Sequence, residues 1–333
     1  MKAVATQHGK VSLAEVERPT LPAGHVRIQT VYSAISPGTE MTFIRRASEK
    51  QIVIGYSAAG IVTELGEGVR RLHLGQRVAC YGAPYVRHAE ELCVPANLVA
   101  PVPDEVSLEE AAFAGLGAIA IHALRTADLR FGESVVVVGL GILGQIIAQI
   151  SSAAAYQVLG YDLNPERADS LKKRIFHTYD TQEELEKAVD TLTGGHGADA
   201  VLLCAGGPGE ELINASLDWI MDKGKVVMVG DLTMNFSRGK MFRKEAQVLI
   251  SRAGGPGRYD TGYELDNKDY PIGFVRWTEG RNTAEFIRLL AEKRIDIKPL
   301  ISRIVPVQAA EEAYHAYGSA SSVMGTVFKY GDC

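Results

Sequence analysis

The rhythm of hydrophobic and polar positions changes along the chain and divides it into three regions. Up to about residue 110, short apolar runs alternate with turn residues, as in "HVRIQTVYSAIS", "AAGIVTELGEGV" and "LGQRVACYG". Many short strands at this spacing are typical of an antiparallel barrel or sandwich. The N-terminal region is therefore predicted to be rich in β-strands.

A different pattern follows, up to residue 252. Continuously apolar runs such as "SVVVVGLG", "ADAVLLCAG" and "KVVMVGD" alternate with helical stretches such as "ILGQIIAQISSAAA" and "TQEELEKAVDTLTG". Apolar strands separated by helices indicate a parallel sheet that is covered on both faces. We predict an α/β fold in which a doubly wound Rossmann domain over 118–252 follows a β-rich domain over 1–117.

The remaining residues, 253–333, begin with the turn-rich "RAGGPGRYDTGYELDNKDYPIG". Two helical patterns, "RNTAEFIRLLAEKR" and "PVQAAEEAYHAYG", and a closing strand "GTVFKY" come after it. No linker or low-complexity segment separates this region from the rest. We expect it to fold back and complete the domain formed by residues 1–117.

Composition and charge exclude some partners. The 333 residues are 46% hydrophobic and 23% charged, with a net charge of −5, which argues against an extended nucleic-acid surface. The longest mostly apolar stretch, 111–124, falls short of the roughly 18 residues that a membrane span needs. The N-terminus shows no secretion signal. We expect a cytoplasmic protein without nucleic-acid or membrane partners.

The cysteines are scattered along the chain and form no C-x-x-C pair. This pattern suggests free thiols in a reducing compartment and no metal cage built from cysteine. The four cysteines are Cys80, Cys93, Cys204 and Cys333.

Three glycines connect a predicted strand to a predicted helix in "VVVVGLGILGQIIAQI". Gly139, Gly141 and Gly144 form a G-x-G-x-x-G, and a second strand downstream ends in an acid. In this context the pattern is the fingerprint of a dinucleotide site. Gly139 permits the tight turn, Gly141 lets pyrophosphate approach the backbone, and Gly144 allows close packing of helix on strand.

Asp162 ends the second strand of this region, where a carboxylate can bind the adenosine ribose and repel the extra phosphate of NADP. Two unit charges about 4 Å apart repel by about 1 kcal/mol in water and about 4 kcal/mol at an effective dielectric constant of 20. NAD is therefore the predicted cofactor, although Arg167 would soften the preference by turning toward the ribose. The alternative is that Asp162 is a helix-capping or loop acid. The predicted cofactor site also includes Ile142, Leu143, Leu163, Cys204, Ala205, Gly206, Val229 and Gly230.

The order of the three regions, with "LGEGVRRLHLGQRVA", "VPANLVAPVPDEVSLEEAA" and "FGESVVVVGLGILGQ", resembles the medium-chain dehydrogenase/reductase superfamily. The resemblance covers nearly the whole chain. It implies a GroES-like catalytic domain, a Rossmann domain and a cofactor cleft between them. It also implies a homodimer, because edge strands of the Rossmann sheet often pair two subunits in this superfamily.

Many members of that superfamily hold a catalytic zinc with a Cys in a Cys-Gly-Thr-Asp stretch and a His in a Gly-His-Glu stretch. Here the first place reads "ISPGTE" and the second reads "GYS", so that Tyr56 stands where the histidine would be. No cysteine lies near residue 116, where a further ligand would stand, and no cysteine-rich loop suggests a structural zinc. Zinc needs three good protein ligands plus water. We predict that this chain binds no metal.

A narrower resemblance is carried by "SPGTE", "GYSAAGIV", "HAEELCVP" and "DYPIGFVRWTEGRN", which look like a zinc-lacking subgroup of sugar or cyclitol metabolism. It implies zinc-independent, NAD-dependent oxidation of a secondary alcohol in a small polyhydroxylated substrate such as a sugar, sugar alcohol or cyclitol. Two enzymatic alternatives are a reductase of enoyl or quinone type and a hydroxyethyl-tetrapyrrole dehydrogenase. A non-catalytic NAD-binding sensor is an alternative of another class.

Without zinc, a side chain must take the hydroxyl proton. The superfamily layout implies that Ser36, Glu40, Tyr56 and His88 converge near the nicotinamide end of the cleft. Histidine titrates near pH 6.5 without tuning, whereas glutamate would need burial and tyrosine a nearby cation to titrate near neutrality. We expect His88 or Glu40 to exchange the proton while Tyr56 orients the substrate hydroxyl and Ser36 contributes to substrate binding.

Each of these residues also has a structural alternative. His88 would then be a hydrogen-bonded histidine of a barrel strand, and Tyr56 a core residue that carries a hydroxyl. Glu40 would close a turn or pair with Arg45 or Arg46.

The segment "SRAGGPGRYDTGYELDNKDYPIGFVRWTE" combines glycine hinges with tyrosines and arginines. Arginine makes paired hydrogen bonds and aromatic rings stack on sugar rings, which suits a hydroxylated or anionic ligand. We predict a substrate lid with Tyr259, Tyr270, Arg276 and Trp277 as substrate-binding residues. The alternative is a surface loop or part of a dimer contact.

Overall fold

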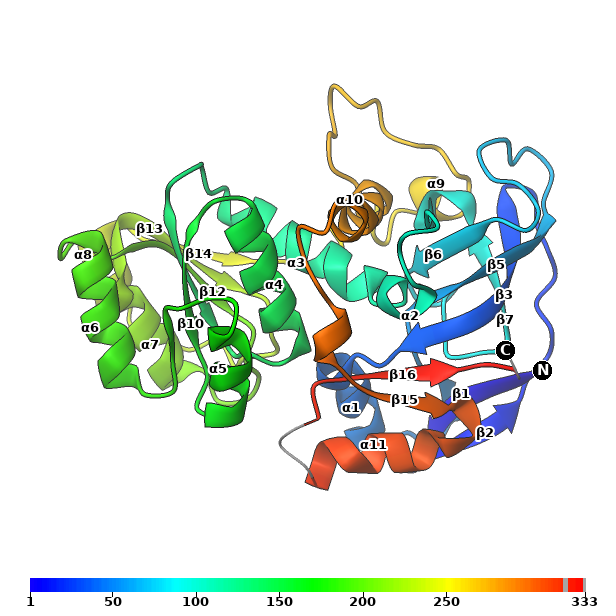
Figure 1. Ribbon diagram of the computed structural model, residues 1–333, viewed down its shortest axis with the longest axis horizontal. Coiled ribbons are helices and arrows are strands. Elements are labelled where there is room, and N and C mark those ends of the chain that lie inside the picture. The colour runs from blue at the N-terminus through cyan, green and yellow to red at the C-terminus, as the bar shows by residue number, and fades with distance from the viewer. Residues whose placement is uncertain (320–322, 332–333) are drawn as a thin grey trace. The chain divides into compact units, whose positions relative to one another are not determined.

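The computed structural model describes residues 1–319 and 323–331. The chain forms two compact units, which Figure 1 shows as ribbons. Unit 1 consists of Met1–Ala118 and Ala253–Cys333, and unit 2 is Ile119–Arg252. Cys333, one of the expected free thiols, lies outside the described residues.

Unit 2 contains a six-stranded sheet in the order β11-β10-β9-β12-β13-β14, in which all neighbouring strands are parallel. This is the strand order of a doubly wound dinucleotide-binding sheet, and the predicted fold class is confirmed. Every residue of the central strand β9 is buried, as expected for a strand that is covered on both faces. The strands are β9 (Ser134–Val138), β10 (Gln157–Tyr161), β11 (Thr178–Tyr179), β12 (Ala198–Leu203), β13 (Ile220–Met228) and β14 (Gln247–Ile250).

Helices cover both faces of this sheet (Figure 1). The predicted helix in "TQEELEKAVDTLTG" is α6, which Thr181 caps by accepting a hydrogen bond from the N–H of Glu184. It ends at Gly194, whose φ of +61° suits glycine in the left-handed C-cap conformation. The helices of this part of the chain are α3 (Ala114–Ala127), α4 (Ile142–Ala153), α5 (Pro165–Lys172), α6 (Gln182–Thr193), α7 (Glu210–Trp219) and α8 (Arg238–Lys244).

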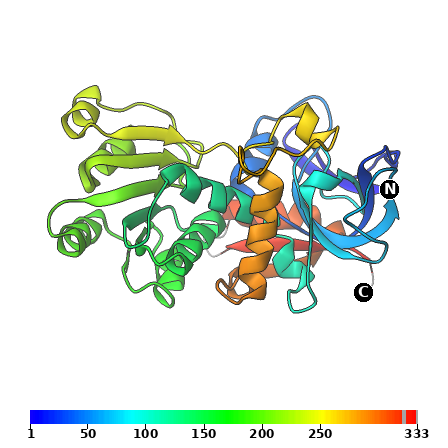
Figure 2. The same cartoon turned by 90° about the horizontal axis from the view of Figure 1, so that it is seen from above.

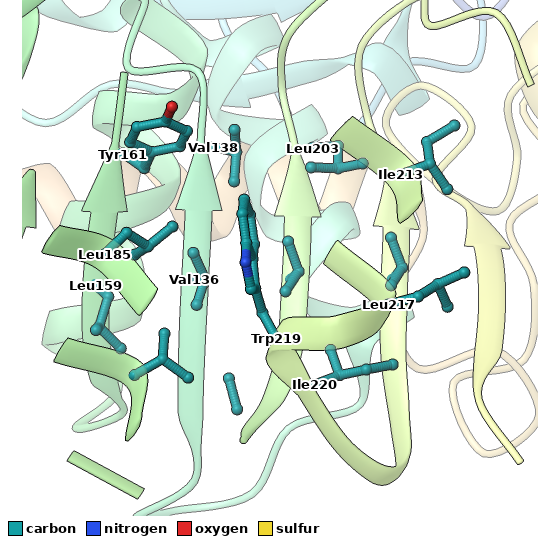
Figure 3. Close-up of a cluster of buried hydrophobic side chains, with 14 of the residues drawn as sticks. Val136, Val138, Leu159, Tyr161, Leu185, Leu203, Ile213, Leu217, Trp219 and Ile220 are labelled. Carbon is teal, nitrogen blue, oxygen red and sulfur yellow. The ribbon is translucent and has the colours of Figure 1, made fainter. Parts of the chain in front are cut away.

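One face of the sheet carries a large apolar cluster, which Figure 3 shows in close-up. Trp219, at the end of α7, lies among the strand side chains and contacts Tyr161 edge-on, with ring centroids 6.2 Å apart. Its indole N–H donates to Glu186 Oε1 at 3.0 Å, so the one polar atom of the ring is satisfied. This packing fixes the position of β9 and β10, which carry predicted cofactor residues at their carboxyl ends.

Unit 1 is built on two sheets. A seven-stranded sheet has the order β15-β16-β3-β5-β6-β8, with β7 also paired to β3, and a three-stranded sheet has the order β2-β1-β4. All pairs except β15 with β16 are antiparallel, in agreement with the predicted β-rich domain. The strands are β1 (Lys2–Gln7), β2 (Lys10–Glu15), β3 (His25–Ala34), β4 (Ile52–Val53), β5 (Ser57–Leu65), β6 (Arg77–Tyr81), β7 (Glu91–Pro95), β8 (Val99–Pro101), β15 (Ile301–Pro306) and β16 (Gly325–Lys329).

The C-terminal segment completes unit 1, because β16 pairs with β3 in the register Val327 to Ala34. Helix α10, whose length is visible in orange in Figure 2, packs against β6 and β8. The remaining helices are α1 (Pro37–Arg45), α2 (Leu108–Ala111), α9 (Thr261–Glu264), α10 (Glu279–Ala291) and α11 (Ala310–Ser319), with 3₁₀ turns η1 (Ala96–Leu98), η2 (Lys298–Leu300) and η3 (Val307–Ala309). Among the described residues, no helix has both the length and the apolar character needed to cross a bilayer.

Candidate active site

The stretch "SPGTE" starts helix α1. Ser36 is its N-cap residue, and Pro37 occupies the first helical position, where its missing N–H is not needed. Glu40 lies in the first turn, and its Oε1 accepts a hydrogen bond from the backbone N–H of Ser36 at 2.9 Å. This contact satisfies the N–H of the cap residue and turns the carboxylate inward. This contact is of the kind that the structural alternative for Glu40 describes, and the catalytic role of Glu40 stays a prediction.

The carboxylate of Glu40 is the centre of a buried polar cluster. Only 1% of Glu40 is exposed, and its Oε2 lies 3.0 Å from Nε2 of His88. The same oxygen accepts a hydrogen bond from the hydroxyl of Tyr314, on α11. A carboxylate in the interior requires such partners, because an unpaired buried charge is strongly unfavourable. The alternative ion pair with the arginines that end α1 is not found among the described residues.

His88 lies in the loop before β7, not within a strand as one interpretation assumed, and none of its surface is exposed. Its Nδ1 is 2.7 Å from Oγ of Ser33, which is 2.9 Å from the hydroxyl of Tyr330. Both ring nitrogens thus face polar atoms, and Phe328 contacts the ring edge-on. In this conformation His88 cannot touch a substrate. Its exchange of a proton stays a prediction, and the geometry restricts it to acting through neighbouring groups.

Tyr56 immediately precedes β5 and donates its hydroxyl hydrogen to Oγ of Ser36. Gly55 makes this approach possible: its φ is +104°, and a Cβ there would lie 2.7 Å from the ring of His88. Burial raises the pKa of Tyr56 to about 12, and the charge of Glu40 adds to the shift. The sequence argument needed a cation that would lower this pKa, and the structure shows the opposite. Tyr56 is a hydrogen-bond donor at neutral pH and not a base.

These contacts define what we call the Glu40 cluster, which gathers residues from β3, α1, two loops, α11 and the end of β16 (Figure 1). The structure brings Ser36, Glu40, Tyr56 and His88 together, while their place near the nicotinamide and their roles stay predictions. Within the cluster only Tyr56 is partly exposed, which makes its hydroxyl the end of the cluster that a ligand can approach. The cluster consists of Ser33, Ser36, Glu40, Tyr56, His88, Tyr314 and Tyr330.

Sequence reasoning missed three members of this cluster. Ser33 lies in β3, and Tyr330 directly follows β16, positions that gave no chemical signal. Tyr314 lies three residues before Tyr317 on α11, and two tyrosines at this spacing share one helix face. That spacing was the one signal in the sequence for a polar contribution from the C-terminal helix.

Ser57, beside Tyr56, has a structural role. It is buried, its Oγ donates to the carbonyl of Ala112 at 2.6 Å, and it accepts from the N–H of Gly115 at 2.8 Å. The two hydroxyls of "GYS" therefore differ: Ser57 ties the start of β5 to the first turn of α3 and the residues just before it. Tyr56 instead contacts Tyr81 edge-on, with ring centroids 5.8 Å apart.

The segment predicted to be a lid contains several internal contacts. Tyr259 is 62% exposed at a φ of +68°, and the guanidinium of Arg258 lies 4.2 Å from the centroid of its ring. Tyr270 is stacked on Tyr263 and donates its hydroxyl to Asp260, so this hydroxyl is engaged within the segment. The guanidinium of Arg276 lies 4.4 Å from the ring centroid of Trp277. Substrate binding by this segment stays a prediction.

The glycine turn in unit 2 has the geometry of a dinucleotide site. A Cβ on Gly144 would lie 1.9 Å from the carbonyl oxygen of Gly139, so this glycine is required for the contact between α4 and β9. A Cβ on Gly141 would meet nothing within 4 Å, which leaves the backbone open to a ligand. The first N–H groups of α4, at Ile142 and Leu143, have no intrahelical acceptor. This end of α4 therefore fits a pyrophosphate.

Asp162 follows β10 and lies beside this turn. Its Oδ2 accepts from the N–H of Leu140 at 2.6 Å, and its Oδ1 accepts from the N–H of Asn164 at 2.8 Å. A carboxylate can accept about four hydrogen bonds, so capacity for a ribose diol remains. Asn164, and not Asp162, is the N-cap of α5, which removes the helix-cap alternative. Arg167 Nη1 lies 3.9 Å from Oδ2 of Asp162, so a cation is next to the predicted ribose position.

The other predicted cofactor residues lie at the same edge of the sheet. A Cβ on Gly230 would lie 2.0 Å from the carbonyl oxygen of Ala205, so the segments after β12 and β13 are in contact. Burial raises the pKa of Cys204 to about 12, which keeps its thiol neutral. Leu163 is 81% exposed next to Asp162. Gly206 follows Ala205, and Val229 precedes Gly230.

Two protein-family models match the chain. The model of the alcohol dehydrogenase GroES-like domain matches residues 22–131, and that of the zinc-binding dehydrogenase matches residues 142–266. The first match covers β3 to β8, and the second covers β10 to β14 and continues to residue 266, beyond unit 2. The chain belongs to the medium-chain dehydrogenase/reductase superfamily. It is accordingly an enzyme, an NAD-type alcohol oxidoreductase.

Relatives in this superfamily are similar over their full length. A sorbitol dehydrogenase of Halalkalibacterium halodurans is 25% identical, with 97% of this chain and 98% of the relative covered. A D-guloside 3-dehydrogenase of Escherichia coli is 26% identical, with 95% of both chains covered. The crystal structure of galactitol-1-phosphate dehydrogenase from Escherichia coli has a TM-score of 0.80 at 20% identity, covering 99% of this chain and 100% of that one. This last likeness shows the fold.

The stretches "ISPGTE" and "GYS", which the resemblance places at the zinc positions of the superfamily, contain no cysteine or histidine. Among the described residues, no group of three or more His, Cys, Asp and Glu side chains is arranged to hold a metal ion. His88 directs its nitrogens to Glu40 and Ser33. Since the matching family model is that of a zinc-binding dehydrogenase, zinc independence of this member stays a prediction.

Proposed function

We propose that this protein is a zinc-independent, NAD-dependent dehydrogenase that oxidises a secondary alcohol of a small polyhydroxylated substrate, such as a sugar, sugar alcohol or cyclitol. The relatives named as sorbitol dehydrogenase and D-guloside 3-dehydrogenase support this substrate class. The observation that carries the proposal is the Tyr56–Ser36 hydroxyl pair, which lies over the buried Glu40 carboxylate.

The reaction breaks a C–H bond and an O–H bond and forms a C=O bond. The hydrogen on carbon leaves as hydride, and NAD supplies the hydride acceptor when it is bound. The hydrogen on oxygen leaves as a proton, and the site must accept it or pass it to solvent. Since NAD becomes NADH, atoms and electrons balance without a metal.

Tyr56 orients the substrate oxygen in this proposal. Its pKa of about 12 keeps the hydroxyl protonated at neutral pH. The single hydroxyl hydrogen, which is donated to Ser36 Oγ in the structure, turns to the substrate oxygen when the alcohol binds. Ser36 Oγ, which accepts from Tyr56, provides a second polar atom at the same position. Such paired hydroxyls suit a substrate that carries neighbouring hydroxyl groups.

In this proposal, the Glu40–His88 pair holds or receives the proton that leaves the substrate hydroxyl. Both residues are buried, so the proton reaches them through the hydroxyl of Ser36 or Tyr56 and not by direct contact. Glu40 meets Ser36 at the backbone N–H, so the transfer requires rotation of the Glu40 carboxylate or a water molecule between them. Tyr314 and Ser33 orient the pair from the other side.

The first experiment measures NADH formation by the full-length enzyme after extensive chelation, with sugars, sugar alcohols and cyclitols, and with NADP in parallel. Turnover that survives chelation is the expected result. Activity that is lost and returns with zinc would refute metal independence. Activity only with NADPH and an enone or quinone would replace the proposal by reduction of double bonds. Cofactor binding without turnover on any substrate would favour a sensor.

The roles within the cluster are tested by single substitutions with a deuterated alcohol as substrate. Glu40→Gln and His88→Ala are expected to slow the isotope-sensitive step, because both disturb the proton route. Near-normal rates in both variants would contradict this part of the proposal. Melting temperatures of both variants separate a lost proton route from a lost fold.

A further inference from the structure

A second buried carboxyl lies near Tyr56 and is not part of the Glu40 cluster. Glu279 is the first residue of α10, and none of its surface is exposed. Neither of its carboxylate oxygens has a hydrogen-bond partner among the described residues. A buried carboxylate without partners is strongly unfavourable, so this side chain requires either a proton or a ligand.

The backbone places Glu279 directly behind Tyr81. A Cβ on Gly254 would lie 2.6 Å from Cε1 of Tyr81 and 3.0 Å from Cβ of Glu279, so both side chains pack on this glycine. The N–H of Glu279 donates to the carbonyl of Pro256 at 2.8 Å. Tyr81 in turn contacts the ring of Tyr56. Tyr81 thus lies between Glu279, in the interior, and Tyr56, at the proposed substrate site.

The charges around Glu279 do not balance if it is ionised. Arg258 is the buried cation of this region, and its guanidinium is bound to Glu264 and to the carbonyl of Ala83. Glu264 also accepts from the N–H of Tyr259 at 3.0 Å. One guanidinium thus faces two carboxyl groups, and its hydrogen bonds go to Glu264. An ionised Glu279 would add a net negative charge to the interior.

Burial dominates the titration of Glu279 and raises its pKa to about 8, an effect that Arg258 opposes and Glu264 reinforces. The N-terminus of α10 favours an anion in its first turn, but by less than complete burial opposes one. Glu279 is therefore mostly protonated at pH 7. The titratable groups that face it from β6, the loop after β6, the segment before α10 and α9 are Tyr81, Tyr85, Arg258, Tyr263, Glu264 and Tyr270.

We propose that Glu279 is a positioning residue of the Tyr56 site, held as a neutral carboxylic acid behind Tyr81, and that its ionisation sets the alkaline limit of alcohol oxidation. The inference rests on the proposed function. Oxidation develops negative charge on the substrate oxygen as the proton leaves. A new buried anion behind Tyr81 disfavours that charge, and its repulsion also holds the tyrosine hydroxyls in their protonated form.

The test compares the pH dependence of kcat/KM in wild type, Glu279→Gln and Glu285→Gln. Glu285 lies on the same helix, pairs with Arg288 on the outer face and serves as the matched control. In wild type and in the control, kcat/KM is expected to fall about tenfold between the neutral plateau and pH 9. In Glu279→Gln, where this position stays neutral, the same ratio is expected to stay near one.

A second variant tests whether Glu279 stays neutral because Arg258 is already paired with Glu264. Glu264→Gln leaves Arg258 free to pair with Glu279, so Glu279 should ionise at lower pH and the fall in kcat/KM should move below pH 8. An alkaline fall that is identical in wild type and Glu279→Gln would overturn the proposal. So would a wild-type profile that stays flat to pH 9.

A measurement without substrate separates this inference from the proposed function. The folded-state pKa of Glu279 exceeds its ordinary value of 4.5, so the stability that its proton contributes is lost as the pH rises from about 4.5 to about 8. The melting temperature of wild type should therefore fall more steeply over this range than that of Glu279→Gln. Equal slopes would overturn the inference even if the enzyme is active. A difference in slope with no turnover on any alcohol would instead support the neutral Glu279 and refute the proposed function.

Discussion

Exposure distinguishes the three tyrosines that surround Glu40. Tyr314 and Tyr330 are buried, and their hydroxyls are bound to Glu40 and Ser33 inside unit 1. Tyr56 reaches the same group of residues from its partly exposed side, through Ser36. Burial raises the pKa of all three, so each keeps its hydroxyl hydrogen. Only Tyr56 is placed to donate to a ligand.

Replacing Tyr56 by Phe removes that donor and leaves the ring contact with Tyr81. We expect kcat/KM for the alcohol to fall by about a hundredfold, as when one donor to a reacting oxygen is removed. Loss of one hydrogen bond to Ser36 should lower stability by only about 1 kcal/mol. Steady-state kinetics and thermal unfolding of the same preparation measure both effects.

Tyr156→Phe is the matched control, because it removes a tyrosine hydroxyl that donates to the carbonyl of Leu129 in unit 2. Its kcat/KM should equal that of wild type. If Tyr56→Phe also kept full activity, Tyr56 would be a structural residue and the proposed hydroxyl pair would be wrong.

The preference for NAD over NADP is also predicted to depend on a single residue, Asp162. Asp162→Asn keeps the shape and an acceptor for the N–H of Leu140 but removes the charge that is predicted to face the 2′-phosphate of NADP. We expect the ratio of kcat/KM for NAD to that for NADP to fall by between about fivefold and about a thousandfold, which corresponds to the ~1 to ~4 kcal/mol of repulsion. Kinetics with both cofactors measure this ratio.

The control is Asp169→Asn, which also removes one negative charge but lies on the exposed side of α5, away from the glycine turn. It should leave the ratio unchanged. An unchanged ratio in Asp162→Asn would mean that Arg167, 3.9 Å from Asp162, already compensates the carboxylate.

At the scale of elements, two glycines at the junction of β9 and α4 are expected to have different roles, Gly144 in folding and Gly141 in cofactor binding. Gly144→Ala places a Cβ 1.9 Å from the carbonyl oxygen of Gly139 and should destabilise unit 2 by about 1–3 kcal/mol, the usual effect of overpacking. Gly141→Ala has space for its Cβ and a φ of −64°, so the fold should be kept. The new methyl group should weaken NAD binding, because it occupies the approach of the pyrophosphate.

Thermal unfolding and titration with NADH distinguish the two variants. The expected pattern is a lower melting temperature in Gly144→Ala alone and weaker NADH binding in both. Unchanged NADH affinity in Gly141→Ala would show that the pyrophosphate does not bind at this turn.

Helix α1 shows a similar coupling of folding and function. The residues that start the helix, Ser36 and Pro37, are also those that bring Glu40 into contact with His88. A short segment with a local folding signal therefore carries the part of the candidate site to which Tyr56 is bound.

At the scale of the whole molecule, the sheet of unit 2 ends at β14, an edge strand with an exposed apolar residue. Ile250 is 65% exposed. An open apolar edge favours pairing with a second chain, whereas a charge opposes it. We predict a homodimer of subunits of 36.0 kDa that pair at this edge, and Ile250→Lys should shift the molar mass in solution to that of one subunit.

Light scattering after gel filtration measures the mass. Phe131→Lys, at an apolar position that is 85% exposed and lies outside the sheet, is the control and should remain dimeric. A wild-type protein with the mass of one chain would contradict the prediction, and a dimer that survives Ile250→Lys would place the interface elsewhere.

Much of the fold could be predicted from the sequence because its signals are local. The apolar runs of β9 and β12, the caps of α6 and the spacing of Gly139, Gly141 and Gly144 each depend on neighbours within one element. Such signals set strand and helix identity, and the order of alternation sets a parallel sheet. The position of Asp162 beside the glycine turn follows from the same sheet, while the roles of the predicted cofactor residues stay predictions.

The candidate active site was predicted only in part. Ser36, Glu40, Tyr56 and His88 were expected to meet because the chain resembles a known family. The inaccessibility of His88, the raised pKa of Tyr56 and the contribution of Tyr314 were not expected. The sequence by itself thus determined the strands, the helices and the dinucleotide turn. Only the tertiary structure decided which polar groups are buried together. Burial and hydrogen bonding depend on contacts between segments that are distant in the sequence, such as β3 and the residue after β16, and no local pattern predicts such contacts.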